Sequence, residues 1–297
     1  MSIRDHEPTQ QPLPEFIGLD ALPLNQAFDV INAEDRCITR AVAVAKEPIV
    51  AAARLIAQTL RQAGRLIYVG SGTGGRLGTA EAAEYPAAFL IERNAVHAID
   101  APDTCDDCTT DALAALDKLT IGAKDVVFGI NVGGPTPFAQ EALRRARERG
   151  ARTVALVCAP EERPTSDADV SICVLTGPEV ISDVTHLKVA IAAKMTLNTI
   201  STLTMLELGK VHRNVMVDID AHRAPDLRDR AVAATAAVTG LPHDQAQALL
   251  DQAGGSVKTA VVMHHQRCTR DESQHKIAQH RGELSAVLGI SEKPPCA

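Results

Sequence analysis

Apolar residues along this chain follow two different spacings. From Leu24 to Gly64 they recur every three or four positions, which predicts helices with one buried face. Beyond Gly64, short, mostly apolar runs alternate with helical stretches; the runs are 65–72, 95–100, 125–131, 152–159 and 170–175. Because the buried strands of a parallel sheet appear as continuous apolar runs, this alternation predicts an α/β fold in which helices cover a parallel sheet.

Helical spacing returns after the last apolar run and persists to the end of the chain. A long apolar segment, 184–210, is followed by four shorter amphipathic segments, 226–241, 242–255, 256–268 and 270–289. The first 25 residues are rich in Pro and Gln and have no regular spacing. We therefore expect an N-terminal irregular segment with a helical arm (1–44), an α/β domain (45–225) and a small C-terminal helical domain (226–297).

Composition and charge narrow the class of protein. Hydrophobic residues make up 45% of the 297 residues, but aromatic residues only 2%, so Ala, Val, Leu and Ile must form the core. The net charge of −7 argues against a nucleic-acid surface, which needs clustered Lys and Arg. The first residues lack the apolar core of a signal peptide, and no apolar run is expected to reach membrane-spanning length.

The cysteines indicate a reducing compartment. There are seven, an odd number, and their spacing is irregular, which predicts free thiols in a cytoplasmic protein. Cys105 and Cys108 resemble half of a zinc site, but no second pair follows at zinc spacing. We therefore do not expect a metal site at these cysteines.

Two glycine-rich turns follow predicted strands. One is GSGTGGRLG at 70–78 and the other is NVGGPTP at 131–137. Glycine lets a backbone approach an anion closely, and the N-terminus of the following helix supplies free N–H groups. In an open α/β sheet, ligands collect at the C-terminal ends of the strands. The turns are therefore candidate anion sites, although tight turns that the fold alone requires have the same sequence.

Carboxylates cluster after the same strands. Glu81 and Glu84 follow the first turn, and Asp100, Asp103, Asp106 and Asp107 follow the second predicted strand. Two carboxylates that face one pocket can divide the work of acid and base. For Glu81, Asp106 and Asp107 we favour helix capping or solvation. For Glu84 and Asp103 we retain both alternatives, that role and catalysis.

Several segments resemble one family. RLIYVGSGTGGRLGTAEAAEYPAAF resembles the signature of N-acetylmuramic acid 6-phosphate etherases, which belong to the sugar isomerase (SIS) superfamily. The resemblance extends over nearly the whole chain, through 24–42, 65–89, 177–219 and 241–263. It implies a three-layer SIS domain, a UBA-like C-terminal helical domain, and a homodimer with its active site at the subunit interface.

The resemblance also implies a reaction and its catalytic residues. Such enzymes eliminate D-lactate from C3 of the open-chain sugar and then add water at C3. A base removes the C2 proton and an acid protonates the departing lactyl oxygen. Glu84 matches the family's proton donor, and Asp103 falls where its second glutamate stands, although Asp is one methylene shorter.

The expected phosphate site departs from the family pattern. Gly74 and Gly133 replace serines, and Pro135 and His186 replace arginines. The candidate substrate-binding residues are Ser71, Gly72, Thr73, Gly74, Arg76, Gly133, Gly134, Thr136, Glu179, Lys188 and Lys210.

These losses leave two alternatives beside an etherase acting on a sugar phosphate. One is a non-catalytic sugar-phosphate-binding regulator, similar to the glucokinase regulator of the same superfamily. The other is an isomerase or lyase for a different sugar, since aldose–ketose isomerisation also begins with removal of the C2 proton. The altered turn suits a smaller anion, a non-phosphorylated sugar acid, or a phosphate held elsewhere.

Overall fold

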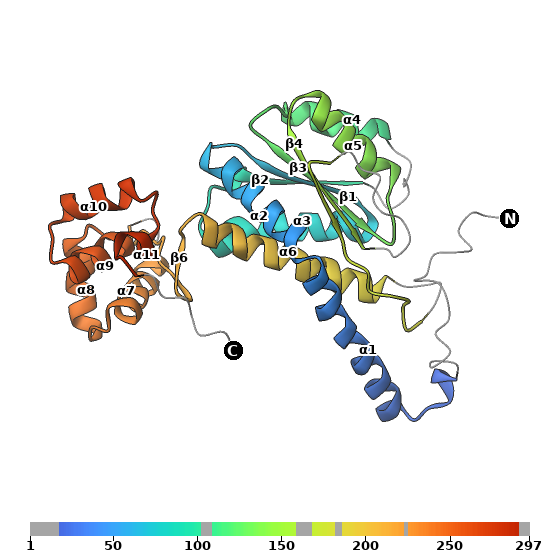
Figure 1. Ribbon diagram of the computed structural model, residues 1–297, viewed down its shortest axis with the longest axis horizontal. Coiled ribbons are helices and arrows are strands. Elements are labelled where there is room, and N and C mark those ends of the chain that lie inside the picture. The colour runs from blue at the N-terminus through green and yellow to red at the C-terminus, as the bar shows by residue number, and fades with distance from the viewer. Residues whose placement is uncertain (1–17, 102–108, 159–167, 182–185, 223–224, 291–297) are drawn as a thin grey trace. The chain divides into compact units, whose positions relative to one another are not determined.

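The computed structural model describes residues 18–101, 109–158, 168–181, 186–222 and 225–290. Contacts divide the chain into two compact units, Met1–Leu203 and Thr204–Ala297 (Figure 1). The division lies inside a long helix, earlier in the chain than the boundary after residue 225 that the sequence suggested.

The first unit alternates strands and helices as the apolar spacing predicted. A short 3₁₀ helix, η3 (Leu19–Ala21), precedes helices α1 (Leu24–Val44) and α2 (Lys46–Arg61). There follow β1 (Leu66–Ser71), α3 (Gly72–Phe89), η4 (Arg93–Ala95), β2 (Val96–Ala101), α4 (Thr109–Leu119), β3 (Val126–Val132), α5 (Pro137–Glu148), β4 (Arg152–Cys158), β5 (Val170–Cys173) and α6 (Leu187–Glu207).

The five strands form one parallel sheet in the order β2-β1-β3-β4-β5. Leu66 of β1 pairs with Val96 of β2 on one side and with Val126 of β3 on the other. The chain leaves β1 towards one edge of the sheet and later returns to its opposite side. The point where the strand order reverses therefore lies between β1 and β3, where ligands bind in doubly wound sheets.

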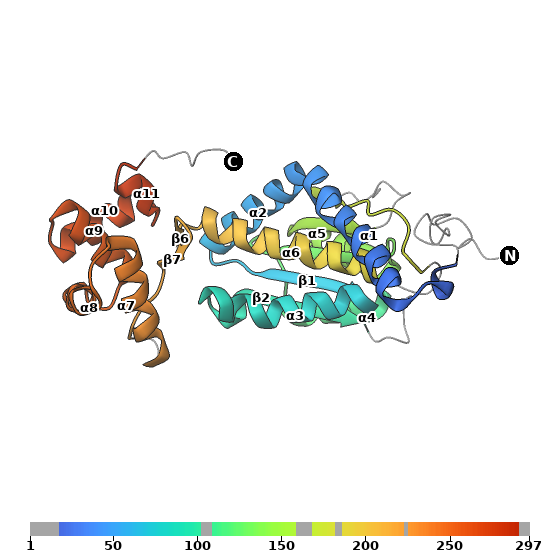
Figure 2. The same cartoon turned by 90° about the horizontal axis from the view of Figure 1, so that it is seen from below.

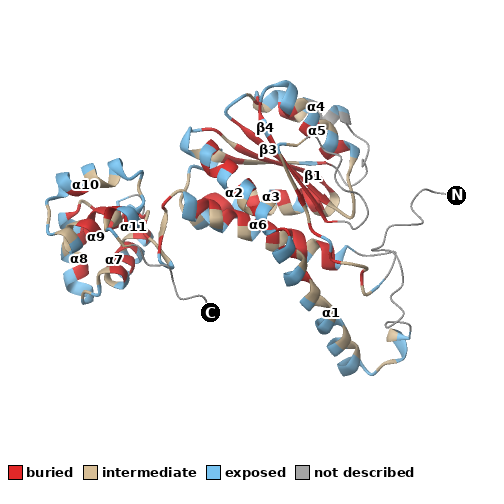
Figure 3. Ribbon diagram, in the orientation of Figure 1, coloured by how far each residue is buried: buried red, intermediate tan, exposed pale blue. Residues whose placement is uncertain are grey.

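Helices cover both faces of this sheet, which gives three layers. Figure 1 shows α4 and α5 on one face and α2, α3 and α6 on the other. Figure 2 shows α6 and α3 side by side, with β1 visible between them. The α4/α5 face packs Leu116, Phe138 and Leu143 against Ile67 and Val127, all of them buried. Figure 3 shows the colour for buried residues concentrated on the strands of the sheet. Burying each such side chain contributes about 1.5–3 kcal/mol, so this layer stabilises the two central strands, β1 and β3, that lead into the turns.

Helix α6 departs from one expectation. By length and composition alone it is apolar enough to cross a membrane, so the expectation that no apolar run reaches that length is wrong for this helix. Half of its most apolar window is buried in the structure. Val189, Ala193, Leu197 and Ile200 have no exposed surface and recur at helical spacing, as in the core helix of a globular unit.

In the second unit, the structure describes one small hairpin followed by a group of helices. It contains β6 (Val211–His212), β7 (Val215–Met216), α7 (Pro225–Thr239), α8 (His243–Gln252), α9 (Val257–Gln266), α10 (Arg270–Gln279) and α11 (Leu284–Val287). Thr269 begins α10 with a capping box that includes Glu272. The segment 270–289 forms two helices because Arg281 and Gly282 both have positive φ, which ends the first of them.

Candidate active site at the carboxyl ends of β1 and β3

The first glycine-rich turn joins β1 to α3, and its glycines have different surroundings. A Cβ added to Gly74 would lie 2.3 Å from the Ile130 carbonyl oxygen, and one added to Gly75 would lie 1.7 Å from Asp100 Oδ1. These two glycines allow α3 to pack against the sheet. Gly72 has φ of +54° and nothing within 4 Å of an added Cβ. Gly72 therefore leaves bare backbone facing open space, as an anion site requires.

Polar side chains of the same turn lie around Gly72. Ser71 is the last residue of β1 and is almost fully buried. In the first turn of α3, Arg76 Nη2 donates to Thr73 Oγ1 at 3.3 Å. Ser71, Gly72, Thr73 and Arg76 are thus together at one strand end, as the sequence predicted, whereas Gly74 is buried against Ile130.

The second turn, after β3, is held by Asn131. Its Oδ1 accepts hydrogen bonds from the backbone N of Thr136 at 3.0 Å and from Thr136 Oγ1 at 3.3 Å, while its Nδ2 donates to the Leu156 carbonyl. Thr136 Oγ1 also accepts from the Ala139 backbone N and so caps α5. The Thr136 hydroxyl therefore already has a donor and an acceptor within the protein.

His186 lies directly over this second turn. A Cβ added to Gly133, where φ is +91°, would lie between 2.2 and 2.9 Å from the Cε1, Nδ1 and Nε2 atoms of His186. The imidazole thus occupies the space that a serine side chain at position 133 would need. The sequence identified these two substitutions separately; the structure brings them together as one packing arrangement.

Glu84 lies on α3 beside Glu81 and Lys194. Lys194 Nζ contacts Glu81 Oε1 and lies 3.2 Å from Glu84 Oε2. The Glu81 side chain is 4% exposed and that of Glu84 is 68% exposed, so the solvated role favoured for Glu81 is wrong. Burial lowers the pKa of Lys194, but the hydrogen bond and charge of Glu81, and then those of Glu84, outweigh it and raise that pKa. Lys194 therefore stays protonated.

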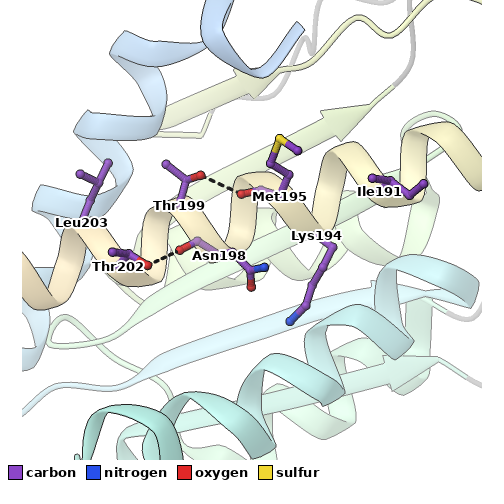
Figure 4. A pocket seen from close by; sticks show the side chains of 7 residues that line it. All are labelled: Ile191, Lys194, Met195, Asn198, Thr199, Thr202 and Leu203. Carbon is purple, nitrogen blue, oxygen red and sulfur yellow. Dashed lines mark hydrogen bonds between the residues drawn. The ribbon is translucent and has the colours of Figure 1, made fainter. Parts of the chain in front are cut away.

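A groove of about 560 Å³ runs along the outer face of α6 beside this cluster (Figure 4). Its lining residues are Ile191, Lys194, Met195, Asn198, Thr199, Thr202 and Leu203. Figure 4 shows Lys194 extending from α6 towards α3. The hydroxyls of Thr199 and Thr202 donate back to carbonyls of their own helix, so Lys194 supplies the charge of an otherwise largely apolar groove.

Two further predicted residues lie at the start of α6. Glu179 accepts hydrogen bonds from the backbone N atoms of Lys188 and Val189 at 2.9 and 3.1 Å, and so caps the helix. Lys188 is fully buried and its Nζ lies 2.6 Å from Glu34 Oε1 on α1. Both side chains thus have partners within the protein that the sequence did not reveal.

Lys210 and Asp103 are the remaining residues that the sequence analysis named. Lys210 belongs to the second unit, where its Nζ pairs with Asp218, which also lies 2.9 Å from Lys258 Nζ. Asp103 lies outside the described residues. The sequence did not single out Lys194, although a lysine within the long apolar run 184–210 is a visible signal.

A parallel sheet with two glycine turns at its switch point, and a carboxylate cluster beside a groove, is an architecture suited to a small anionic ligand. The N-acetylmuramic acid 6-phosphate etherase of Trichormus variabilis is 41% identical to this chain over 294 residues, 96% of this chain and 95% of that protein. The etherase of Nostoc sp. is 40% identical over the same shares. The chain therefore belongs to the N-acetylmuramic acid 6-phosphate etherase family, which confirms the resemblance.

The remaining comparisons give weaker similarities. No family model matches the chain. A phosphoheptose isomerase from Neisseria gonorrhoeae is 20% identical with a TM-score of 0.47, covering 61% of this chain and 99% of that one. The sugar isomerase domain of the RpiR transcription factor from Sphaerobacter thermophilus is 17% identical with a TM-score of 0.43, covering 73% and 99%.

Proposed function

We propose that this chain is a carbon–oxygen lyase that cleaves the D-lactyl ether of N-acetylmuramic acid 6-phosphate by elimination and addition of water. The observation that carries the proposal is 41% identity over nearly the full length of a protein named for that activity. The presence of Glu84 beside an open groove supports it, because an acid must be within reach of the bound ether oxygen.

The residues divide into a catalytic pair and an anion site. Glu84 protonates the lactyl oxygen as the C3–O bond breaks, and Asp103 removes the C2 proton. The turns at Gly72 and Gly133 receive the phosphate, together with Ser71, whose strand end lies next to Gly72. We expect the reaction to proceed through these side chains with neither a metal nor an organic cofactor.

A homodimer in the cytoplasm completes the proposal. Phe28 and Leu24 on α1, and Leu187 and Ile191 on α6, are large apolar side chains that face solvent, with Phe28 65% exposed. Exposed apolar surfaces of this kind commonly mark interfaces. We infer that a second copy covers these faces and closes the groove beside Glu84.

A coupled D-lactate assay with N-acetylmuramic acid 6-phosphate tests the activity. The wild type should release lactate, whereas Glu84→Ala should lose about a hundredfold or more in rate. Glu47→Ala, which removes an exposed carboxylate from α2, is the matched control and should keep wild-type activity. If the wild type is folded by circular dichroism and releases no lactate, the proposed activity is wrong.

One observation favours a second candidate, a sugar-phosphate-binding regulator. The second turn offers few free donors, because Gly133 has no side chain and Thr136 is used as a cap. A regulator would bind the 6-phosphate sugar, seen as a rise in melting temperature, without turning it over. Binding with lactate release excludes this alternative.

A further inference from the structure

Lys194 connects a buried carboxylate to an exposed one. Glu81 and Glu84 are three residues apart on α3 and so lie on the same face of that helix. Lys194 reaches both of them from α6, contacting Glu81 and lying 3.2 Å from Glu84 Oε2. The ammonium is therefore fixed on one side by a buried anion and faces the proposed acid on the other.

The buried surroundings of Glu81 hold its ion pair with Lys194 in place. Glu81 is buried on α3, which packs against β1, where Tyr68 is also fully buried. The pKa of Tyr68 is raised well above its usual value by burial first, then by the nearby Tyr85 and Glu81. A buried carboxylate needs a partner charge, and Lys194 supplies it. Lys194 therefore cannot swing away from α3 without leaving Glu81 unpaired.

Lys194 does not need its contact with Glu84 in order to compensate the buried charge of Glu81. An ion pair with so exposed a carboxylate contributes at most about 1 kcal/mol to stability. The ammonium already compensates Glu81, so its second contact has a small structural effect. The same contact holds the Glu84 side chain in one orientation. Without it, the exposed carboxylate would sample other rotamers in solvent.

We propose that Lys194 is a positioning residue, which holds the Glu84 carboxyl group at the edge of the α6 groove and stabilises the anion that Glu84 becomes. This inference rests on the proposed function, because it takes Glu84 as the acid. As the base takes the C2 proton, the electron pair of the C2–H bond forms the C2–C3 double bond. The C3–O bond breaks towards the lactyl oxygen, which takes the proton of Glu84 and leaves the carboxylate beside Lys194.

The test compares Lys194 variants of the full chain in the D-lactate assay. We expect Lys194→Met to lower kcat by about tenfold to a hundredfold, because one preorganised charge beside the acid is lost. The KM should change by less than about threefold, since Lys194 acts through Glu84 and not on the sugar. Lys194→Arg should restore most of kcat. Lys46→Met, which removes an exposed lysine from α2, is the matched control.

A second variant separates this role from a failure to fold. Lys194→Met leaves Glu81 buried without its partner, so Glu81→Leu with Lys194→Met removes both charges and avoids that penalty. This double variant should keep the wild-type circular dichroism spectrum and still show the reduced kcat.

Each outcome of these assays bears on a different claim. A wild type that releases no lactate overturns the proposed function together with this inference. An active wild type with an unchanged kcat in the folded double variant overturns the role of Lys194 alone. A loss that appears mainly in KM, or that arginine does not restore, also overturns it.

Discussion

Gly72 and Gly74 stand two residues apart in one turn, yet the structure predicts different effects for the same substitution. Gly74→Ala places a Cβ 2.3 Å from the Ile130 carbonyl oxygen, well inside a normal contact. The obstacle is backbone of a central strand, so no side-chain rotation relieves it. We expect a loss of about 1–3 kcal/mol in stability from this overpacking.

Gly72→Ala meets open space instead. Its cost is the left-handed backbone at φ of +54°, about 1–2 kcal/mol for a residue with a Cβ. The new methyl group lies where the bare backbone faces solvent, so it obstructs an anion. We expect Gly72→Ala to raise the KM for the 6-phosphate substrate, whereas Gly74→Ala lowers stability without a comparable change in KM.

Thermal unfolding, monitored by circular dichroism, measures the change in stability. Initial rates at temperatures well below the unfolding transition measure KM. About 2–4 °C of melting temperature corresponds to each kcal/mol in a unit of roughly 200 residues. The reasoning is refuted if Gly74→Ala melts like the wild type, or if Gly72→Ala leaves KM unchanged. Gly74→Ser meets the same carbonyl, so the serine of the family pattern cannot be restored here without a shift of β3 or α3.

Three other expectations concern contacts of the described residues. Burial raises the pKa of Asp218, but the charges of Lys258 and Lys210 outweigh it and hold that pKa below its ordinary 3.8. The stability from Asp218 and its two lysines is therefore fully present above 3.8 and lost as pH falls through the lowered pKa; the melting temperatures of the wild type and Asp218→Asn should differ at pH 7, and the difference should shrink as the pH falls below 3.8. Thr136→Ala should cost about 1 kcal/mol through loss of the α5 cap, and Thr136→Ser should retain most of it; equal melting temperatures for wild type and Thr136→Ala would contradict the cap. Glu179→Ala should cost about 2 kcal/mol, because two helix N–H groups lose a charged acceptor, and urea unfolding measures it against Glu179→Gln as the milder change.

The apolar spacing predicted the architecture of the first unit well because its three central strands are buried on both sides. The strands β1, β3 and β4 are almost entirely buried, so their sequences are continuous apolar runs. The C-terminal helices were also recognisable from their amphipathic spacing. The break between α10 and α11 was not, because Arg281 adopts a positive φ that an arginine in sequence gives no reason to expect.

The candidate site was predictable in position and less so in detail. Glycine turns after strands locate the ligand edge of an α/β sheet, so Gly72 was identified correctly as part of a turn at that edge. The remaining details of the site depend on contacts between residues that are far apart in the sequence. Glu81 meets Lys194 across 113 positions, and Lys188 meets Glu34 across 154, distances at which local spacing contains no information.

Asn131 has a consequence for how a ligand would be received. One buried amide ties the end of β3 to the β4 backbone at Leu156 and to the start of α5 at Thr136. The turn between them is thus held in place by the protein itself, and a ligand bound at this proposed site would avoid the ordering entropy of about 1–2 kcal/mol that each flexible residue would cost. Association at this turn should accordingly be a single step, with an observed rate that rises linearly with ligand concentration and shows no slow loop closure.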